Sequence, residues 1–414
     1  MPLARRTCAL VCTVVLTSTG LVLSPSAGAA PSTRVPASHH RESPQVALDW
    51  ELSSFRTVYT DGLTPIPVGV PVLGFTSVAM NNANRMSRHL HRSSETAAVA
   101  TAAHDVLLHY YPTAAPALDA DLATSLGPVP EGRARANGIR VGRRAAVRML
   151  ASRVGDGYLD PDIHYSKDPG PGVWQPIPPN PDMVAAWLGS LRPLVTRHPV
   201  AWGKKPYPLD SRAYARDFNE VRRLGRVDST VRTDAQTATA QFYNSNSATM
   251  VGEALIRRLG DHPIGLRATT RIFAAMHAAM TNSVIRTWQL KRDVGFWRPE
   301  QAIALADTDG NPRTRVETGW APLVPTPNYS EYVSGHASLT APAIEVIRRT
   351  LGERTPLELV SVNSPDPRLY TRLSAIERDA FNARIWSGLH FRKAMTDGYE
   401  IGHRSARQVL AALR

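Results

Sequence analysis

Residues 265–299 read GLRATTRIFAAMHAAMTNSVIRTWQLKRDVGFWRP. Apolar side chains recur at helical spacing over residues 265–292, and two cations, Lys291 and Arg298, stand at the end of the run. Their separation is nearly two helical turns, although Pro299 favours an extended backbone at the residue before it. The stretch therefore predicts a long helix that ends in a compact ammonium and a planar guanidinium, either of which suits an oxyanion. A solvated basic helix end is the alternative for this motif alone.

A second motif, Ser334-Gly335-His336, stands between a proline-rich loop and a helical run over residues 337–351. This position predicts a helix N-terminus, where free amides and the helix dipole favour an anion. Ser334 offers a hydroxyl, Gly335 an approachable amide, and His336 an imidazole that can move a proton. The tripeptide alone equally describes a capped helix start.

A third motif places Arg384 six positions before His390. An unbroken helix would turn these side chains about 120° apart, so we expect Gly388 to break it and let both reach one point. An imidazole nitrogen there can attack phosphorus or coordinate vanadium, provided that a partner holds the other ring nitrogen. The sequence does not identify this partner.

The rest of the chain favours an all-α fold, because strand-like alternation is scarce and alanine-rich amphipathic runs recur. Gly225 and Gly260 are plausible helix stops, whereas Ser94 and Asp182 are plausible caps. The predicted helices are Glu95–Tyr111, Gly132–Arg153, Met183–Leu194, Ala213–Leu224, Asp234–Leu259 and Gly265–Arg292.

Residues 1–30 are typical of a cleavable secretory signal, with Arg5-Arg6, an apolar stretch and small residues at its end. The arginine pair leaves twin-arginine export as an alternative to ordinary secretion. Residues 31–45 predict a flexible arm, residues 46–247 an N-terminal helical half, and residues 248–414 a catalytic helical half. We therefore expect an extracellular protein without a membrane span and, because both cysteines lie in the signal, without a disulfide.

The formal net charge is +13, and it falls to +11 when the signal is removed. This charge favours anionic small molecules, acidic polymers or nucleic acid, or it serves solubility alone. No nucleic-acid-binding motif accompanies it, so no specific nucleic-acid partner is expected.

The three motifs together resemble the vanadium-dependent haloperoxidases of the type-2 phosphatidic acid phosphatase superfamily. The family pattern is Lys-x6-Arg-Pro, then Pro-Ser-Gly-His, then Ser-Arg-x5-His. Here the corresponding stretches begin at Lys291, Val333 and Ala383, so that valine replaces the proline and alanine the serine. Neither change removes a charge, but each bears on vanadium affinity and halide scope.

The resemblance implies that His390 binds vanadium, and that His336 is the acid/base group. Hydrogen peroxide would be activated on the vanadate, polarised by Lys291, and attacked by a halide to give a hypohalous acid or an equivalent species. An organic acceptor is a further expected partner, whereas halide preference and oligomeric state stay open. The vanadate oxygens would be held by Lys291, Arg298, Ser334, Gly335 and Arg384.

The position of Ala394 often carries an acid in relatives, and Asp397, three residues further on, is a candidate substitute that would orient the histidine. A secreted acid phosphatase of the same superfamily is the alternative function, in which His390 forms a phosphohistidine and His336 protonates the leaving group. A non-catalytic binder of acidic polymers is a third reading.

Overall fold

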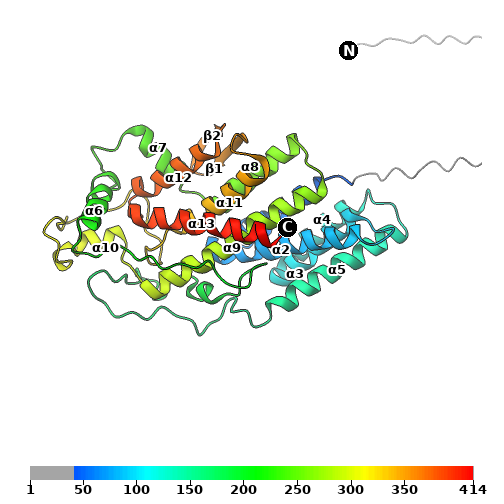
Figure 1. Cartoon of the computed structure of the whole chain (residues 1–414), viewed down its shortest axis with the longest axis horizontal. Coiled ribbons are helices and arrows are strands. Elements are labelled where there is room, and N and C mark those ends of the chain that lie inside the picture. The colour runs from blue at the N-terminus through cyan, green and yellow to red at the C-terminus, as the bar shows by residue number, and fades with distance from the viewer. Residues whose placement is uncertain (1–41, 414) are drawn as a thin grey trace, which may run out of the picture. The chain divides into compact units, whose positions relative to one another are not determined.

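A computed structural model describes residues 42–413, and these residues form thirteen α-helices and one β-hairpin. The predicted all-α class is confirmed (Figure 1). The signal and residues 31–41 lie outside the described residues. The α-helices are α1 (Gln45–Phe55), α2 (Ile66–Arg88), α3 (Glu95–Tyr110), α4 (Ala115–Leu126), α5 (Arg133–Arg153), α6 (Arg212–Leu224), α7 (Asp234–Phe242), α8 (Ser247–Asp261), α9 (Leu266–Val294), α10 (Pro299–Ala304), α11 (Gly335–Leu351), α12 (Leu373–Trp386) and α13 (Arg392–Ala412). The shorter elements are η1 (Arg56–Asp61), η2 (Pro112–Ala114), η3 (Ala186–Ser190), η4 (Ala306–Thr308), β1 (Leu357–Ser361) and β2 (Ser364–Tyr370).

Four of the predicted helices correspond to α3, α5, α6 and α9 within one or two residues. The prediction of one helix over Asp234–Leu259 is wrong, because Asn246 begins a new helix by accepting the amide of Ala248 at 3.0 Å. The helix predicted for Met183–Leu194 is also wrong, since only the short turn η3 forms there. Gly189 lies so close to α9 that a Cβ atom would stand 2.5 Å from the backbone nitrogen of Gln289.

The antiparallel hairpin of β1 and β2 was not predicted. Its first strand alternates buried and exposed residues, with Leu357 and Leu359 turned inward. The second strand, SPDPRLY, contains two prolines, which hide a strand signal and fit an edge position.

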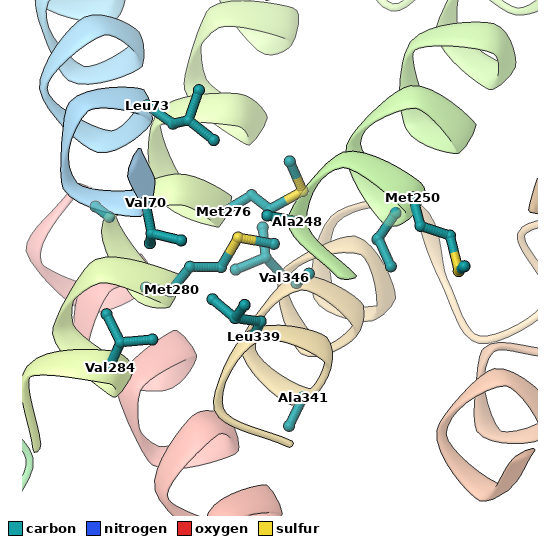
Figure 2. Packing of buried hydrophobic residues seen from close by; sticks show 14 of the residues in the cluster. Val70, Leu73, Ala248, Met250, Met276, Met280, Val284, Leu339, Ala341 and Val346 are labelled. Carbon is teal, nitrogen blue, oxygen red and sulfur yellow. The ribbon is translucent and has the colours of Figure 1, made fainter. Parts of the chain in front are cut away.

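The helix α9 is the axis of the packed helices. Figure 2 shows Met276 and Met280 of α9 between Val70 of α2 and Leu339 and Val346 of α11. All five side chains are buried. Burial of a side chain of this size contributes roughly 1.5–3 kcal/mol, so this contact between distant segments fixes the position of α9.

Helices α11 and α13 run antiparallel to α9. Thr287, late in α9, contacts Ser338 at the start of α11, while Ser405, late in α13, donates to the carbonyl of Ala279 at 2.7 Å. The C-terminal end of α9 and the N-terminal ends of α11 and α13 therefore lie together. Two of the three predicted anion motifs are at these ends.

A buried polar group ties α1, α2 and α9 together. The carboxyl group of Glu51 accepts the hydroxyl of Ser77 at 2.7 Å and lies 3.0 Å from Nε2 of His277. Both Glu51 and His277 are fully buried, and Nδ1 of His277 has no partner among residues 42–413. His277 is thus a packed helical residue remote from the three motifs.

Glu51→Ala is expected to lower the free energy of unfolding by about 3 kcal/mol, because it leaves His277 and Ser77 buried without their shared acceptor. Asp49→Ala, an exposed acid on the same helix, is the control and should change it by less than about 0.5 kcal/mol. Chemical denaturation measures both. Equal unfolding midpoints would show that the buried group does not stabilise the protein.

The described residues form one compact unit, in which α2 of the predicted N-terminal half packs along α9 of the predicted catalytic half. The division near Ala248 stays a prediction. Between residues 42 and 413, none of the helices has the length and apolar character that crossing a bilayer requires.

Candidate functional site

Lys291 reaches the site from the last turn of α9. The helix ends at Val294, and the left-handed conformation of Gly295 (φ 61°, ψ 40°) then turns the chain away. The ammonium donates to the carbonyl oxygens of Ser330 at 2.7 Å and Glu331 at 3.1 Å. Two of its three protons are therefore held by backbone from the loop before α11.

Arg298 lies in extended conformation just before Pro299, which begins α10. Its Nε donates to the carbonyl of Tyr329 at 2.8 Å, and its Nη1 donates to the carbonyl of Leu389 at 2.9 Å. Nη1 also lies 3.2 Å from Nε2 of His390. The guanidinium thus joins the second and third motifs.

A distant loop fixes the backbone that precedes Arg298. Trp174 donates its amide to the carbonyl of Gly295 at 2.8 Å, and Trp297 donates to the carbonyl of Gly172 at 3.0 Å. The proline- and glycine-rich stretch around Trp174 therefore holds the backbone on which Arg298 stands through these hydrogen bonds.

Ser334 caps the N-terminus of α11, which places the Ser-Gly-His motif as predicted. Its Oγ accepts the amide of Ala337, and its carbonyl accepts the first helical bond from Ser338 at 3.1 Å. The N–H groups of Gly335 and His336 come before this first helical hydrogen bond, so they have no acceptor within the helix and can donate to an anion. His336 is partly exposed, whereas Ser334 and Gly335 are buried.

The turn between Arg384 and His390 is built around Gly388. Helix α12 ends at Trp386, and Gly388 takes φ +81°. A Cβ atom at Gly388 would stand 2.5 Å from the carbonyl oxygen of Gly225, so only glycine fits. The predicted helix break is confirmed.

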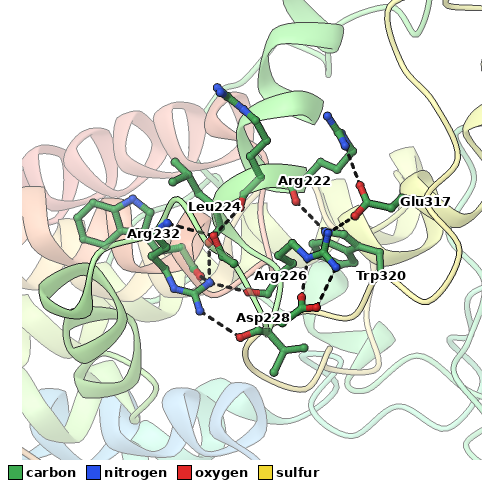
Figure 3. Close-up of polar contacts among 11 residues, drawn as sticks. Arg222, Leu224, Arg226, Asp228, Arg232, Glu317 and Trp320 are labelled. Carbon is green, nitrogen blue, oxygen red and sulfur yellow. Dashed lines mark hydrogen bonds and ion pairs between the residues drawn. The ribbon is translucent and has the colours of Figure 1, made fainter.

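Arg232 fastens this turn to the loop after α6 (Figure 3). Its Nη1 donates to the carbonyl oxygens of Leu224 at 2.6 Å, Arg226 at 2.7 Å and Trp386 at 3.3 Å. Figure 3 also shows Glu317 bridging Arg222 and Arg226 beside Trp320. The backbone that leads to His390 is thus held by a guanidinium that is not part of the site.

The orientation of His390 follows from its two neighbours. Arginine only donates, so Nε2 of His390 accepts from Arg298 and the ring proton must be on Nδ1. Nδ1 lies 3.0 Å from Oε1 of Glu331, which also accepts the amide of Phe391 at 3.0 Å. Glu331 therefore holds the ring and leaves the Nε2 lone pair directed toward the cations.

Asp397 is not the partner of the histidine, so that prediction is wrong. Its carboxylate accepts the hydroxyl of Tyr332 at 2.7 Å and pairs with Lys393 at 2.8 Å. Asp397 lies more than one turn into α13, and its side chain contacts Tyr332 in the loop before α11 instead of the imidazole of His390.

Tyr329 covers the two cations with its ring. The ring centroid lies 5.0 Å from Nζ of Lys291 and 4.9 Å from Cζ of Arg298. Trp288 stands beside it, with the ring centroids 5.2 Å apart. Tyr329 is partly exposed, as is His336.

Three buried cations share this site with a single carboxyl group. The side chains of Lys291, Arg298, Arg384, Glu331 and His390 belong to residues that are 0–3% exposed. Burial lowers the pKa of Lys291 well below its usual value, and Arg298 lowers it further. Burial also lowers the pKa of Arg384 to about 10 and raises that of Glu331 to about 8. An anion is the partner that would relieve this excess of positive charge.

Both histidines are held neutral. Burial lowers the pKa of His390 well below its usual value, followed by the charges of Arg298 and Lys291. Burial and Arg384 do the same to the pKa of His336. All three cations lower the pKa of both rings, which indicates that the three motifs lie near one another.

Unused donors show that the residues fit an oxyanion. Nη2 of Arg298 and Nε of Arg384 are buried, and neither has a hydrogen-bond partner among residues 42–413. Buried donors are nearly always satisfied, so these two call for acceptors. Tetrahedral oxygens beside the Nε2 lone pair of His390 would supply them, as phosphate or vanadate does.

The sequence missed two features of the site. Glu331 precedes Ser-Gly-His by three positions, and its carboxylate in a buried loop was the available signal. The ring of Tyr329 carried no signal of its own, and the carbonyl acceptors of Lys291 and Arg298 are invisible in any sequence. The predicted roles of the seven site residues stay predictions, although the structure brings their side chains and amides to one place.

Comparison with known proteins bears on the family. The model of the VCPO second helical-bundle domain matches residues 271–414, which include all three motifs. A search of curated sequences finds no match. The similarity to known proteins therefore rests on the match to the domain model and on the similarity to solved structures.

Solved structures share the fold over most of the chain. A bacterial vanadium-dependent iodoperoxidase is similar with a TM-score of 0.71 and 20% identity, over 90% of this chain and 97% of its own. The holo form of a bacterial vanadium-dependent chloroperoxidase has a TM-score of 0.66 and 17% identity, over 84% and 92%. The apo form of a bacterial vanadium-dependent chloroperoxidase gives 0.67 and 17%, over 84% and 93%. The resemblance predicted from the motifs is thus confirmed: residues 271–414 match the model of the VCPO second helical-bundle domain, on a chain that shares its fold with bacterial vanadium-dependent haloperoxidases.

Proposed function

We propose that this protein is a vanadium-dependent haloperoxidase that oxidises a halide with hydrogen peroxide. One observation carries the proposal: Nε2 of His390 meets the buried guanidinium of Arg298, the charges of Lys291 and Arg384 also lower the pKa of the ring, and Glu331 holds the opposite ring nitrogen. This arrangement suits a histidine-bound oxyanion, and it lies in a fold shared with a vanadium-dependent iodoperoxidase and chloroperoxidase.

Six groups would hold vanadate. Nε2 of His390 would bind the vanadium, and the oxygens would meet Lys291, Arg298 and Arg384. The hydroxyl of Ser334 and the amide of Gly335 would add neutral donors from the N-terminus of α11. Bound in this way, vanadate would supply a Lewis-acidic centre that activates peroxide without a change of oxidation state.

The protein's own residues would orient and transfer protons. Lys291 keeps one N–H free of its two carbonyl acceptors, and this N–H can polarise a bound oxygen. His336, partly exposed and neutral, can accept a proton from peroxide and return it. The buried cations need no reorganisation when negative charge develops.

A secreted acid phosphatase is the second candidate. The same unused N–H groups of Arg298 and Arg384 would donate to phosphate oxygens, and neutral His390, whose Nε2 carries the lone pair, is a competent nucleophile. His336 would then protonate the leaving group.

Two assays on the purified mature protein separate the candidates. After incubation with orthovanadate, we expect peroxide-dependent bromination of a phenolic dye at mildly acidic pH, and none without vanadate. Hydrolysis of a phosphate ester by the protein without vanadate is measured in parallel. Ester hydrolysis inhibited by vanadate, without bromination, would establish the phosphatase and refute the haloperoxidase.

We further propose that the enzyme is secreted through the signal in residues 1–30, with hydrogen peroxide, a halide and an organic acceptor as its partners. The apolar run after Arg5-Arg6 supports export. N-terminal sequencing of the protein from culture medium, with an expected start near Pro31, tests this. An unprocessed N-terminus in the cell fraction would contradict it.

A further inference from the structure

A large cavity lies at the opposite ends of the helices that form the oxyanion site. Its volume is about 970 Å³, and it is lined by the start of α9 and the last turns of α11 and α13. The residues Arg267 and Lys291 are 24 positions apart on α9, which corresponds to roughly 36 Å along a helix. The cavity is therefore separate from the pocket around His390.

Arginines dominate the charged lining of this cavity: Arg88, Arg267, Arg271, Arg349 and Arg407. Three of them have acidic partners. Arg349 and Arg407 share Glu345 at 2.6 and 3.6 Å, and Arg88 lies 3.8 Å from Glu95. Arg267 and Arg271 make no ion pair and no side-chain hydrogen bond with any residue from 42 to 413. Two guanidinium groups one helical turn apart are thus open to an anion.

The two glutamates of the lining are already engaged. The carboxylate of Glu42 accepts the amide of Glu95 at 2.9 Å and the hydroxyl of Ser94 at 3.1 Å, so it caps α3. Glu95 accepts the side-chain amide of Asn84 at 2.7 Å. Neither carboxylate is hydrogen-bonded or paired to Arg267 or Arg271, so the cavity keeps an excess of positive charge.

The other wall of the cavity is apolar. It is formed by Ile264, Leu266, Ile272, Leu351 and Leu410. Leu266 and Ile272 pack into the core with 4% and 2% exposure, which makes this wall rigid. Small-molecule sites combine such an apolar surface with a few placed polar groups in a volume of roughly 300–1,000 Å³.

We propose that this cavity binds an amphipathic anion, with a carboxylate or sulfonate head on Arg267 and Arg271 and an apolar body on the leucine and isoleucine wall. A purely inorganic anion would leave that wall in water, and a neutral apolar ligand would leave the two guanidinium groups unused. The site is independent of the proposed peroxidase chemistry, because its residues lie at the far end of α9.

Fluorescence titration with 1-anilinonaphthalene-8-sulfonate, an amphipathic sulfonate, tests the site in the full-length mature protein. Arg267→Gln/Arg271→Gln is expected to raise the dissociation constant at least 10-fold, because charge-assisted hydrogen bonds to the head are lost. Arg140→Gln/Arg144→Gln on the exposed face of α5 removes the same charge elsewhere and should change it less than twofold. Dodecanoate should displace the dye, whereas dodecanol should not.

Ala268→Trp provides an independent variant, since it fills the cavity without changing the charge. It should weaken dye binding to a similar extent in protein whose unfolding temperature is unchanged. Undiminished binding in both Ala268→Trp and Arg267→Gln/Arg271→Gln would overturn the proposal. Equally weak dye binding in Arg140→Gln/Arg144→Gln would show that the dye responds only to the general surface charge. Displacement of the dye by dodecanol would refute the proposed role of an anionic head group.

Discussion

Replacement of His390 by alanine is expected to abolish vanadate-dependent bromination, with activity at least about 1,000-fold below that of the unchanged protein. The reason is chemical. Nε2 is in contact with the guanidinium of Arg298, which cannot coordinate a metal, and the carboxyl of Glu331 lies on the opposite side of the ring. His336 is assigned to proton transfer, so His390 is the residue proposed to bind the vanadium.

His403→Ala is the matched control. His403 lies on α13, and its Nε2 is 2.7 Å from Glu377, away from the three motifs. We expect it to keep at least half of the activity. Binding of orthovanadate, measured by isothermal titration calorimetry, should be lost in His390→Ala and kept in His403→Ala. Vanadate-dependent turnover in His390→Ala would show that another residue binds the metal, and equal loss in both variants would indicate unfolding.

Glu331→Ala is expected to weaken vanadate binding by about 10- to 100-fold, the usual effect of losing the partner of a metal-bound histidine. The change removes the acceptor of His390 Nδ1 and of the Phe391 amide together. The ring of His390 is then free to rotate, and its proton can move to Nε2. A protonated Nε2 has no lone pair with which to bind a metal. The measurement is the vanadate dissociation constant, together with kcat and KM for bromide.

Two further variants separate orientation from charge. Glu331→Gln keeps an oxygen acceptor and should recover most of the affinity if orientation is what matters. Asp397→Ala removes a buried carboxylate of the same region that pairs with Tyr332 and Lys393, and it should affect vanadate binding much less. A larger loss in Asp397→Ala than in Glu331→Ala would contradict the assignment of the partner.

The cations and the helix starts of the site could be predicted because each depends on local sequence. Pro299 sets the extended conformation of Arg298, and Ser334 caps α11, in both cases through neighbours in the chain. The contact between Glu331 and His390 joins residues 59 positions apart and follows from the packing of α11 on α13. Sequence alone therefore offered Asp397, which is nearer in the chain and wrong.

The fold shows the same division between local and distant causes. The long helix α9 was predicted because its apolar periodicity is sustained over residues 265–292. The break between α7 and α8 was missed because the residues 243–247 (YNSNS) stand between two alanine-containing runs of helical periodicity, and the decisive cap of Asn246 is one hydrogen bond. The turn η3 replaced a predicted helix because α9 occupies the space that a regular helix would need.

The way in which the cations are held has a consequence for the stability of the protein itself. Lys291 and Arg298 are fixed by carbonyl oxygens of the chain, so their mutual repulsion is opposed in the folded state by the single carboxyl group of the site, that of Glu331. Folding must therefore assemble a like-charged cluster before any ligand arrives, and an oxyanion that enters returns part of that free energy. The protein should melt at a higher temperature in phosphate than in chloride at equal ionic strength, so that the choice of buffer would alter its measured thermal stability.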